Sequence, residues 1–243
     1  MRLKVIACRV FAPELEVLSG ESNDELTIDY LPLRAHDKPE VLRADIQARI
    51  DDSRDFDAVI LAYGLCGNAA ASLRAGSIPL YIPRAHDCSH ILLGGLDAHA
   101  AHFADTPSRG WTSRGYLAEE SDPFRTVDSE FGWDMETLVK QYGEENARYV
   151  WETLHATADD DDPVLYFLDV PETRSPEVLA EAKNVAAARG KELRVIPATL
   201  DLLARLLGGR GGRDILAVPP GGVIRPTWDD SVLTSDDTTE KPA

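Results

Sequence analysis

The stretch "DFDAVILAYG" at residues 55–64 indicates the fold class. Two aspartates lead into an unbroken apolar run, and Gly64 follows it. A strand without polar alternation has neither face in water, which is typical of a parallel sheet that helices cover on both faces. The stretch therefore predicts a central β-strand that is buried on both sides.

The same kind of pattern continues in both directions along the chain. Further strands are predicted within residues 3–8, 27–36, 78–86, 162–170, 191–198 and 213–224. Helices are predicted at 38–52, 68–76, 91–105, 135–156, 175–190 and 199–209. Strands that alternate with helices predict an α/β fold with mainly parallel sheets and helices on both faces.

The less regular stretch at 106–134 indicates a possible division of the chain. We expect an N-terminal α/β lobe at 1–106 and a C-terminal α/β lobe at 107–226. Two Rossmann-like lobes around a cleft are one arrangement of this kind. Residues 227–243 are polar, and we expect them to form a disordered tail.

Charge and composition exclude some classes of partner. The formal net charge of −17 argues against nucleic acid, whose phosphates need a basic surface. No apolar run reaches the length of a membrane-spanning helix, so no membrane partner is expected. The N-terminus enters a strand pattern at once and lacks the apolar core of a signal peptide. We therefore expect a cytoplasmic protein with reduced thiols.

The three cysteines share one kind of position, because each lies at or just past the end of a predicted strand. In parallel sheets these carboxyl ends meet at one edge, where ligands bind. His86 lies two residues before Cys88, and thiolates and imidazoles are the ligands that Zn²⁺ prefers. The sequence therefore predicts a metal site made of Cys8, Cys66, His86 and Cys88. Zn²⁺ is the first expectation, with Fe²⁺ or an iron–sulfur cluster as alternatives.

Two charged residues beside this set are candidates for catalytic roles. Asp87 is placed to orient His86 as a hydrogen-bond acceptor, or it faces away. Arg84 is placed to bind the carboxylate or phosphate of a small anionic metabolite.

The loop around Cys66 is a candidate cofactor-binding loop. Gly64 and Gly67 permit positive φ and close backbone approach on both sides of the cysteine. Asn68 completes the loop. The simpler interpretation is a strand-to-helix turn in which Asn68 caps the helix predicted at 68–76.

Other interpretations of the same residues stay open. A cysteine at a strand end is often a small buried residue without further role. Alternatively, Cys66 or Cys88 is a catalytic nucleophile with His86 as its base. His99 and His102 lie on the predicted helix at 91–105, where a solvent-exposed role is expected.

Several segments together resemble the domain-of-unknown-function family 1638. They are "LAYGLCGN", "PRAHDCSHILLG", "YGEENARY" and "VPPG", and the resemblance extends over about residues 3–222. It implies that Cys8, Cys66, His86 and Cys88 are the site residues. It also implies an association with corrinoid-dependent methyltransferase systems, so a corrinoid protein or a methyltransferase is the expected partner. The segment around Gly110 and Trp111 lacks the longer aromatic lead-in of that family.

Two functions are consistent with these observations. The first is an enzyme or accessory enzyme of one-carbon metabolism, in which a Cys/His-bound metal activates a small anionic substrate. The second is a non-enzymatic protein that binds a metabolite or delivers a metal to a methyltransferase. The chain lacks a D-x-H-x-x-G motif, so direct binding of cobalamin through such a loop is not expected.

Overall fold

The computed structural model describes residues 1–33, 35–104, 110–118, 135–144, 147–148 and 162–236. The elements of the first part are β1 (Arg2–Cys8), η1 (Arg9–Phe11), α1 (Ala12–Glu21), β2 (Glu25–Leu31), η2 (Ala35–Asp37), α2 (Pro39–Asp51), β3 (Ala58–Ala62), β4 (Leu80–Pro83), α3 (Cys88–Leu93) and α4 (Leu96–Phe103). Those of the second part are β5 (Trp111–Ser113), α5 (Arg114–Leu117), α6 (Met135–Tyr142), β6 (Val164–Asp169), η3 (Pro171–Thr173), α8 (Pro176–Ala188), β7 (Glu192–Pro197), α9 (Asp201–Leu207), β8 (Ile215–Val218), β9 (Val223–Pro226) and β10 (Leu233–Asp236).

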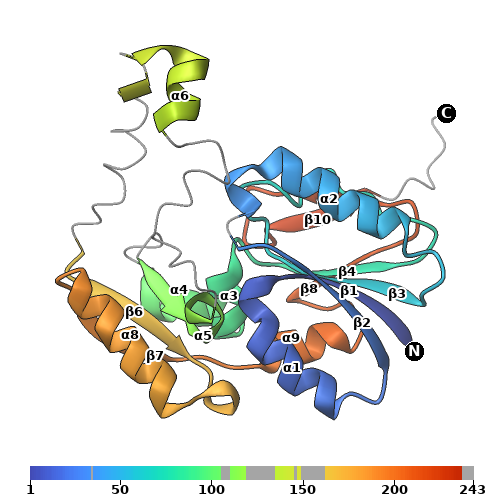
Figure 1. The fold of residues 1–243 in the computed structure, drawn as a ribbon. Helices are drawn as coiled ribbons and strands as arrows, with labels where there is room; N and C mark the ends of the chain where they lie inside the picture. Colours follow the sequence, from blue (N-terminus) through green and yellow to red (C-terminus); the bar gives the residue numbers. More distant parts are fainter. Residues whose placement is uncertain (34, 105–109, 119–134, 145–146, 149–161, 237–243) are drawn as a thin grey trace.

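The larger sheet has the strand order β2-β1-β3-β4-β8, with β8 alone antiparallel to its neighbour. All five residues of β3 are buried, and β3 is the middle strand, which confirms the prediction from the stretch at 55–64. Helix α2 covers one face of this sheet, and α1 and α9 cover the other (Figure 1). The predicted α/β class with a mainly parallel sheet is therefore confirmed.

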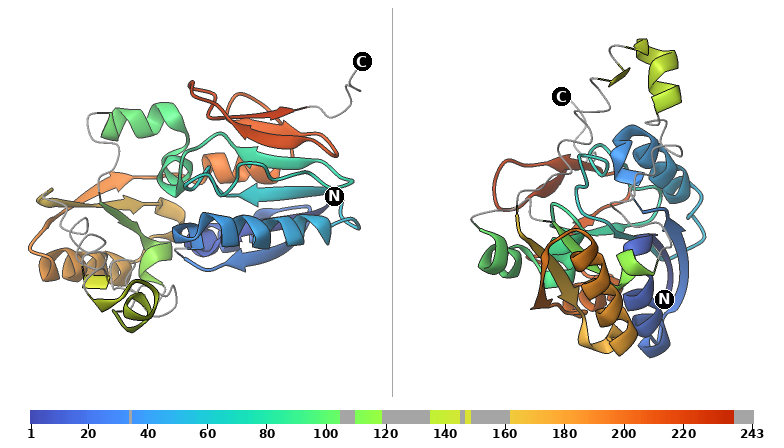
Figure 2. Two further views of the ribbon diagram at one scale, coloured as in Figure 1. Left: turned by 90° about the horizontal axis from the view of Figure 1, so that it is seen from above. Right: turned by 60° about the vertical axis from the view of Figure 1, so that its left-hand side comes forward.

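The smaller sheet has the order β5-β6-β7 and is entirely parallel. Helix α8 packs against it, beginning at Pro176 with the side chain of Ser175 as its N-cap. The two sheets lie on either side of α5 (Figure 2). Strand β8, from the expected C-terminal lobe, belongs to the larger sheet. The division into two lobes at residue 106 stays a prediction.

The C-terminal strands form a hairpin. β9 and β10 pair antiparallel, so residues 233–236 of the expected disordered tail form a strand. The stretch at 213–224, expected as one strand, forms β8, a turn and the start of β9. Within the described residues, none of the helices combines the length and the apolarity needed to cross a membrane.

The helix predicted at 68–76 was wrong. Asn68 and Ser72 have φ values of 68° and 68°, which a right-handed helix cannot contain. The segment instead pairs with the C-terminal part of the chain, since the Ser72 amide donates to the Ile224 carbonyl at 2.9 Å. Tertiary pairing therefore replaces the local helical preference of its alanines.

The helix predicted at 91–105 is divided in two. Gly94 and Gly95 have φ values of 97° and 132°, and they end α3 before α4 begins. Helix α1 was missed, because no prediction covered residues 9–26. The end of the helix predicted at 135–156 lies outside the described residues.

Candidate functional site

The loops after β3 and β4 are in close contact at the carboxyl edge of the larger sheet. The Cys66 amide donates to the His86 carbonyl at 2.9 Å. Gly64 has no room for a side chain, because an added Cβ would lie 2.8 Å from the Asp87 nitrogen and 2.9 Å from the Ala85 carbonyl oxygen. The absence of a side chain at residue 64 therefore permits the close approach of the two cysteine-bearing loops.

The backbone around Cys66 is left-handed over three consecutive residues. Cys66, Gly67 and Asn68 have φ values of 45°, 62° and 68°. Non-glycine residues in this region cost energy and persist where the surrounding structure holds them. Arg43 stabilises this backbone conformation, because its Nη2 donates a hydrogen bond to the Asn68 carbonyl at 2.7 Å. The cofactor-binding role of Gly64, Gly67 and Asn68 stays a prediction.

The three cysteines come together as one buried group. Cys8, Cys66 and Cys88 are 4%, 6% and 6% exposed. Hydrogen bonding to Cys66 and to Cys8, together with burial, raises the pKa of the Cys88 thiol well above its ordinary value. We call Cys8, Cys66 and Cys88 the cysteine cluster. Cys8 ends β1, and Cys66 and Cys88 follow β3 and β4, which are the next two strands of the sheet.

The buried Tyr63 and the partly buried Tyr116 lie near the cysteine cluster. Burial and the nearby Cys8, Cys88 and Cys66 raise the pKa of the Tyr63 phenol. Burial and the same cysteines also raise the pKa of Tyr116 on α5. Both phenols were missed from the sequence. Tyr63 could have been found by its place before Gly64, but Tyr116 lies far from the three cysteines in the sequence and left no local signal.

His86 is not buried with the thiols. Its side chain is exposed, and its ring lies edge-to-face with His90 at a centroid distance of 5.3 Å. Although the side chain is exposed, part of the ring is removed from water. This desolvation and the neighbouring His90 lower the pKa of His86, and Asp87 acts in the opposite direction. The structure thus groups three of the four predicted ligands in the core and places the fourth at the surface.

Asp87 caps helix α3. Its carboxylate accepts from the amides of Ser89 and His90 at 2.9 and 3.3 Å, and it contacts Nδ1 of His90 at 2.9 Å. Burial acts to raise the pKa of Asp87, but the hydrogen bonds from His90 and Ser89 outweigh it and hold that pKa far below its ordinary value. Asp87 therefore orients His90, whereas the sequence left open whether it orients His86 or faces away.

Arg84 binds the C-terminal hairpin. Its guanidinium donates to the carbonyls of Ser231, at 3.1 Å, and Leu233. Its amide donates to the Asp214 carbonyl at 2.8 Å. These donors are directed at backbone oxygens, and the predicted role of Arg84 in holding an anionic substrate stays a prediction.

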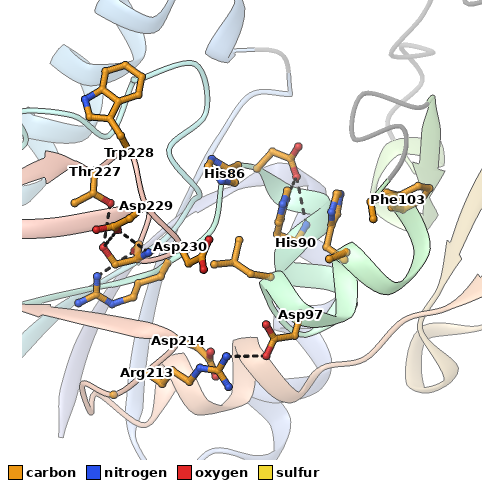
Figure 3. Close-up of a pocket in the computed structure, with 18 residues that line it drawn as sticks. His86, His90, Asp97, Phe103, Arg213, Asp214, Thr227, Trp228, Asp229 and Asp230 are labelled. Atoms are coloured by element: carbon orange, nitrogen blue, oxygen red, sulfur yellow. Dashed lines mark hydrogen bonds and ion pairs between the residues drawn. The ribbon is translucent and has the colours of Figure 1, made fainter.

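A surface cleft of about 1090 Å³ lies beside the β4 loop (Figure 3). We call it the histidine cleft, and its charged and aromatic lining residues are Arg84, His86, Asp87, His90, Asp97, His99, Phe103, Arg213, Asp214, Trp228, Asp229 and Asp230. His90 and His99 are only 7% and 5% exposed, and their rings stack at 3.6 Å. The expected solvent-exposed role is therefore wrong for His99, while His102 is exposed. Burial and the neighbouring His90 lower the pKa of His99 to about 4.

A buried carboxyl group on α1 was also missed. Glu14 is 1% exposed, and burial raises its pKa to about 7. Its Oε1 accepts from the Thr173 hydroxyl at 3.3 Å. Its Oε2 is buried and has no hydrogen-bond partner among the described residues. Nothing in the apolar pattern around residue 14 separates this glutamate from the exposed Glu16 two positions later.

The side chains of the described residues at the cysteine cluster and in the histidine cleft do not already form a metal-binding geometry. Across the residues that the structure describes, no three side chains of His, Cys, Asp or Glu are placed to hold a metal ion. Cys88 contacts both Cys66 and Cys8 instead.

One comparison with known proteins finds a match. The model of a family described as "Protein of unknown function (DUF1638)" matches residues 30–207, which include Cys66, His86 and Cys88. No curated protein and no solved structure matches the chain.

Proposed function

The chain belongs to the DUF1638 family of proteins of unknown function, and we propose that its cysteine cluster binds Zn²⁺ through three thiolates, with a fourth position open to a substrate. Such a site would make the protein a metal-dependent enzyme or accessory enzyme that acts on a small anionic molecule. The observation that supports this most directly is the contact of Cys88 with both Cys66 and Cys8.

The chemistry of the donors fits this ion. Thiolates are preferred ligands of Zn²⁺, and catalytic zinc sites keep three protein ligands and one exchangeable position. The carboxyl ends of parallel strands are where α/β proteins bind their ligands. The cysteine cluster has both properties, because its members end or follow β1, β3 and β4.

Binding would require local changes in the cluster. The thiols would lose their protons, and the sulfurs would rotate from mutual contact toward the ion. Bound zinc acts as a Lewis acid and stabilises a bound thiolate or alkoxide. The phenols of Tyr63 and Tyr116 lie beside the thiols, where they can hold a proton or orient a substrate. The predicted corrinoid or methyltransferase partner rests on the family resemblance alone.

Elemental analysis of the full chain tests the proposal. Protein purified without chelator should contain about one zinc per chain or take it up on addition of Zn²⁺. Cys66→Ser and Cys88→Ser should reduce that content to near zero. Tyr116→Phe is the matched control, because it alters the same site without removing a sulfur and should keep the metal.

The zinc content of the His86→Gln variant is measured in the same experiment. Retained zinc would leave the three thiols as the protein ligands, and lost zinc would return His86 to the ligand set predicted from the sequence. Wild-type protein that holds no zinc and gains none on addition would overturn the proposal.

A metal-free thiol site is the second candidate. It is favoured by the mutual contact of the thiols and by the lack of preformed metal geometry among the described residues. Cys66 or Cys88 would then be the nucleophile. A protein without metal whose activity toward an electrophile is abolished by Cys88→Ser would support it.

A further inference from the structure

The histidine cleft contains a pair of imidazoles that the proposed function does not use. His90 is nine-tenths buried and lines the cleft, and only its Nδ1 contacts a carboxylate, that of Asp87. His86 lies beside it at the exposed edge. We propose that the histidine cleft binds a divalent first-row transition metal ion, with Nε2 of His90 and the imidazole of His86 as its protein ligands.

The distance between the two ring centroids is compatible with joint ligation. With metal–nitrogen bonds of about 2.1 Å and a tetrahedral angle, two ligating imidazoles have ring centroids about 5 Å apart. The rings of His86 and His90 have centroids 5.3 Å apart and planes inclined by 65°. Two rings at this distance and inclination can direct one nitrogen each at a single ion.

The ring of His90 is held in the orientation that a ligand needs. Asp87 accepts at 2.9 Å from Nδ1, which leaves Nε2 as the nitrogen available to a metal. A carboxylate on the far nitrogen is the usual partner of a metal-bound histidine. His99 stacks on the face of His90 with an angle of 7° between the rings, so it restricts rotation of His90. The same parallel stacking prevents His99 from sharing the ion, because their ring planes do not meet.

The charge of the cleft favours a cation. Five aspartates line it against two arginines, and these aspartates are Asp87, Asp97, Asp214, Asp229 and Asp230. Arg213 is paired with Asp97 at 2.8 Å and Arg205 with Asp214 at 2.7 Å, and the carboxylates still outnumber these cations and Arg84. No third protein ligand is in place among the described residues, so water or a bound metabolite would occupy the remaining positions. The site is therefore one for an exchangeable ion.

A nickel titration of a chain without the cysteine cluster tests this site. The full-length Cys66→Ser/Cys88→Ser variant, with its fold checked by circular dichroism, is titrated with Ni²⁺ by calorimetry. We expect it to bind one equivalent. Adding His90→Gln, whose amide can still donate to Asp87, should weaken binding at least tenfold. Adding His102→Gln, which removes an exposed histidine outside the cleft, should leave it unchanged.

A second measurement on the wild-type chain covers the case in which the double variant does not fold. X-ray absorption at the nickel edge should show nitrogen and oxygen neighbours for the ion in the histidine cleft, and the His90→Gln chain should lose them. Failure to bind Ni²⁺, equal binding with and without His90, or equal loss in the His102 control would overturn the inference. These outcomes do not depend on zinc at the cysteine cluster, whose ion would have sulfur neighbours.

Discussion

The cysteine cluster and the histidine cleft begin at the same place in the chain but differ in almost every physical property. His86 and Cys88 are two residues apart, yet the imidazole is exposed and the thiol is 6% exposed. The thiols lie near the phenols of Tyr63 and Tyr116, whereas the imidazoles of His86 and His90 lie beside the Asp87 carboxylate in the lining of an open cleft. The short segment after β4 therefore passes from surface to core, and its two ends support different chemistry.

The difference arises from what covers each region. Helix α5 packs against η1, the segment that follows Cys8, and Tyr116 on that helix lies close enough to the cysteine cluster for the thiols to influence its pKa. The hairpin β9–β10 borders the histidine cleft and is held by Arg84 while leaving the space open. Substitutions on the covered side should consequently have large effects, and those at the cleft should have small ones.

The largest effect is expected where α5 meets η1. A Cβ at Gly115 would lie 1.7 Å from the Val10 carbonyl oxygen, so Gly115→Ala must displace backbone. We expect a loss of more than about 3 kcal/mol in the free energy of unfolding. Urea denaturation measures it, and faster reaction of the cysteines with a thiol reagent should accompany it.

Gly20→Ala is the control for this substitution. Gly20 lies in α1 with no atom within 4 Å of an added Cβ, so alanine should be neutral or stabilising by up to about 1 kcal/mol. Similar free energies of unfolding for the two variants would show that α5 does not pack closely against η1.

A pH-dependent effect is expected from Glu14. Its pKa is raised from 4.5 to about 7 in the folded chain, so the folded state holds the proton more tightly than the unfolded state. Stability should therefore fall as pH rises from about 4.5 to 7, by about 3 kcal/mol in total. Glu14→Gln removes this titration and should be the more stable chain at pH 8, by up to about 3 kcal/mol. Urea denaturation at pH 5 and pH 8 measures the change.

Glu16→Gln is the matched control, because Glu16 is exposed on the same helix. It should leave the pH dependence of stability unaltered. A Glu14→Gln chain with the same pH dependence as wild type would mean that Glu14 is ionised in the folded protein.

The smallest effect is expected at the cleft. Arg84→Gln removes the hydrogen bonds to the hairpin carbonyls and should cost about 1–2 kcal/mol in unfolding free energy. Arg213→Gln is the control, since its exposed ion pair with Asp97 should contribute less than about 1 kcal/mol. Unchanged stability of the Arg84 variant, together with weaker binding of an anionic metabolite, would restore the substrate-binding role predicted from the sequence.

Local pattern was a good guide wherever one residue's neighbours in sequence decide its environment. The apolar run at 55–64 predicted the buried central strand, and the helix predicted at 175–190 is α8. The helix at 68–76 failed because Asn68 and Ser72 have positive φ and the segment pairs with a strand more than a hundred residues later. The helix propensity of a segment contains no information about a pairing partner so far away in the sequence.

The sequence by itself determined the α/β class and indicated that Cys8, Cys66 and Cys88 lie at one edge of the sheet, because parallel strands bring their carboxyl ends to that edge. Only the tertiary structure decided that Asp87 orients His90, that Glu14 is buried, and that Tyr116 lies near the thiols. These features depend on contacts between segments far apart in the chain. The direction of a loop side chain such as that of His86 is likewise decided by what packs against the loop, and two-residue or helical periodicity does not encode it.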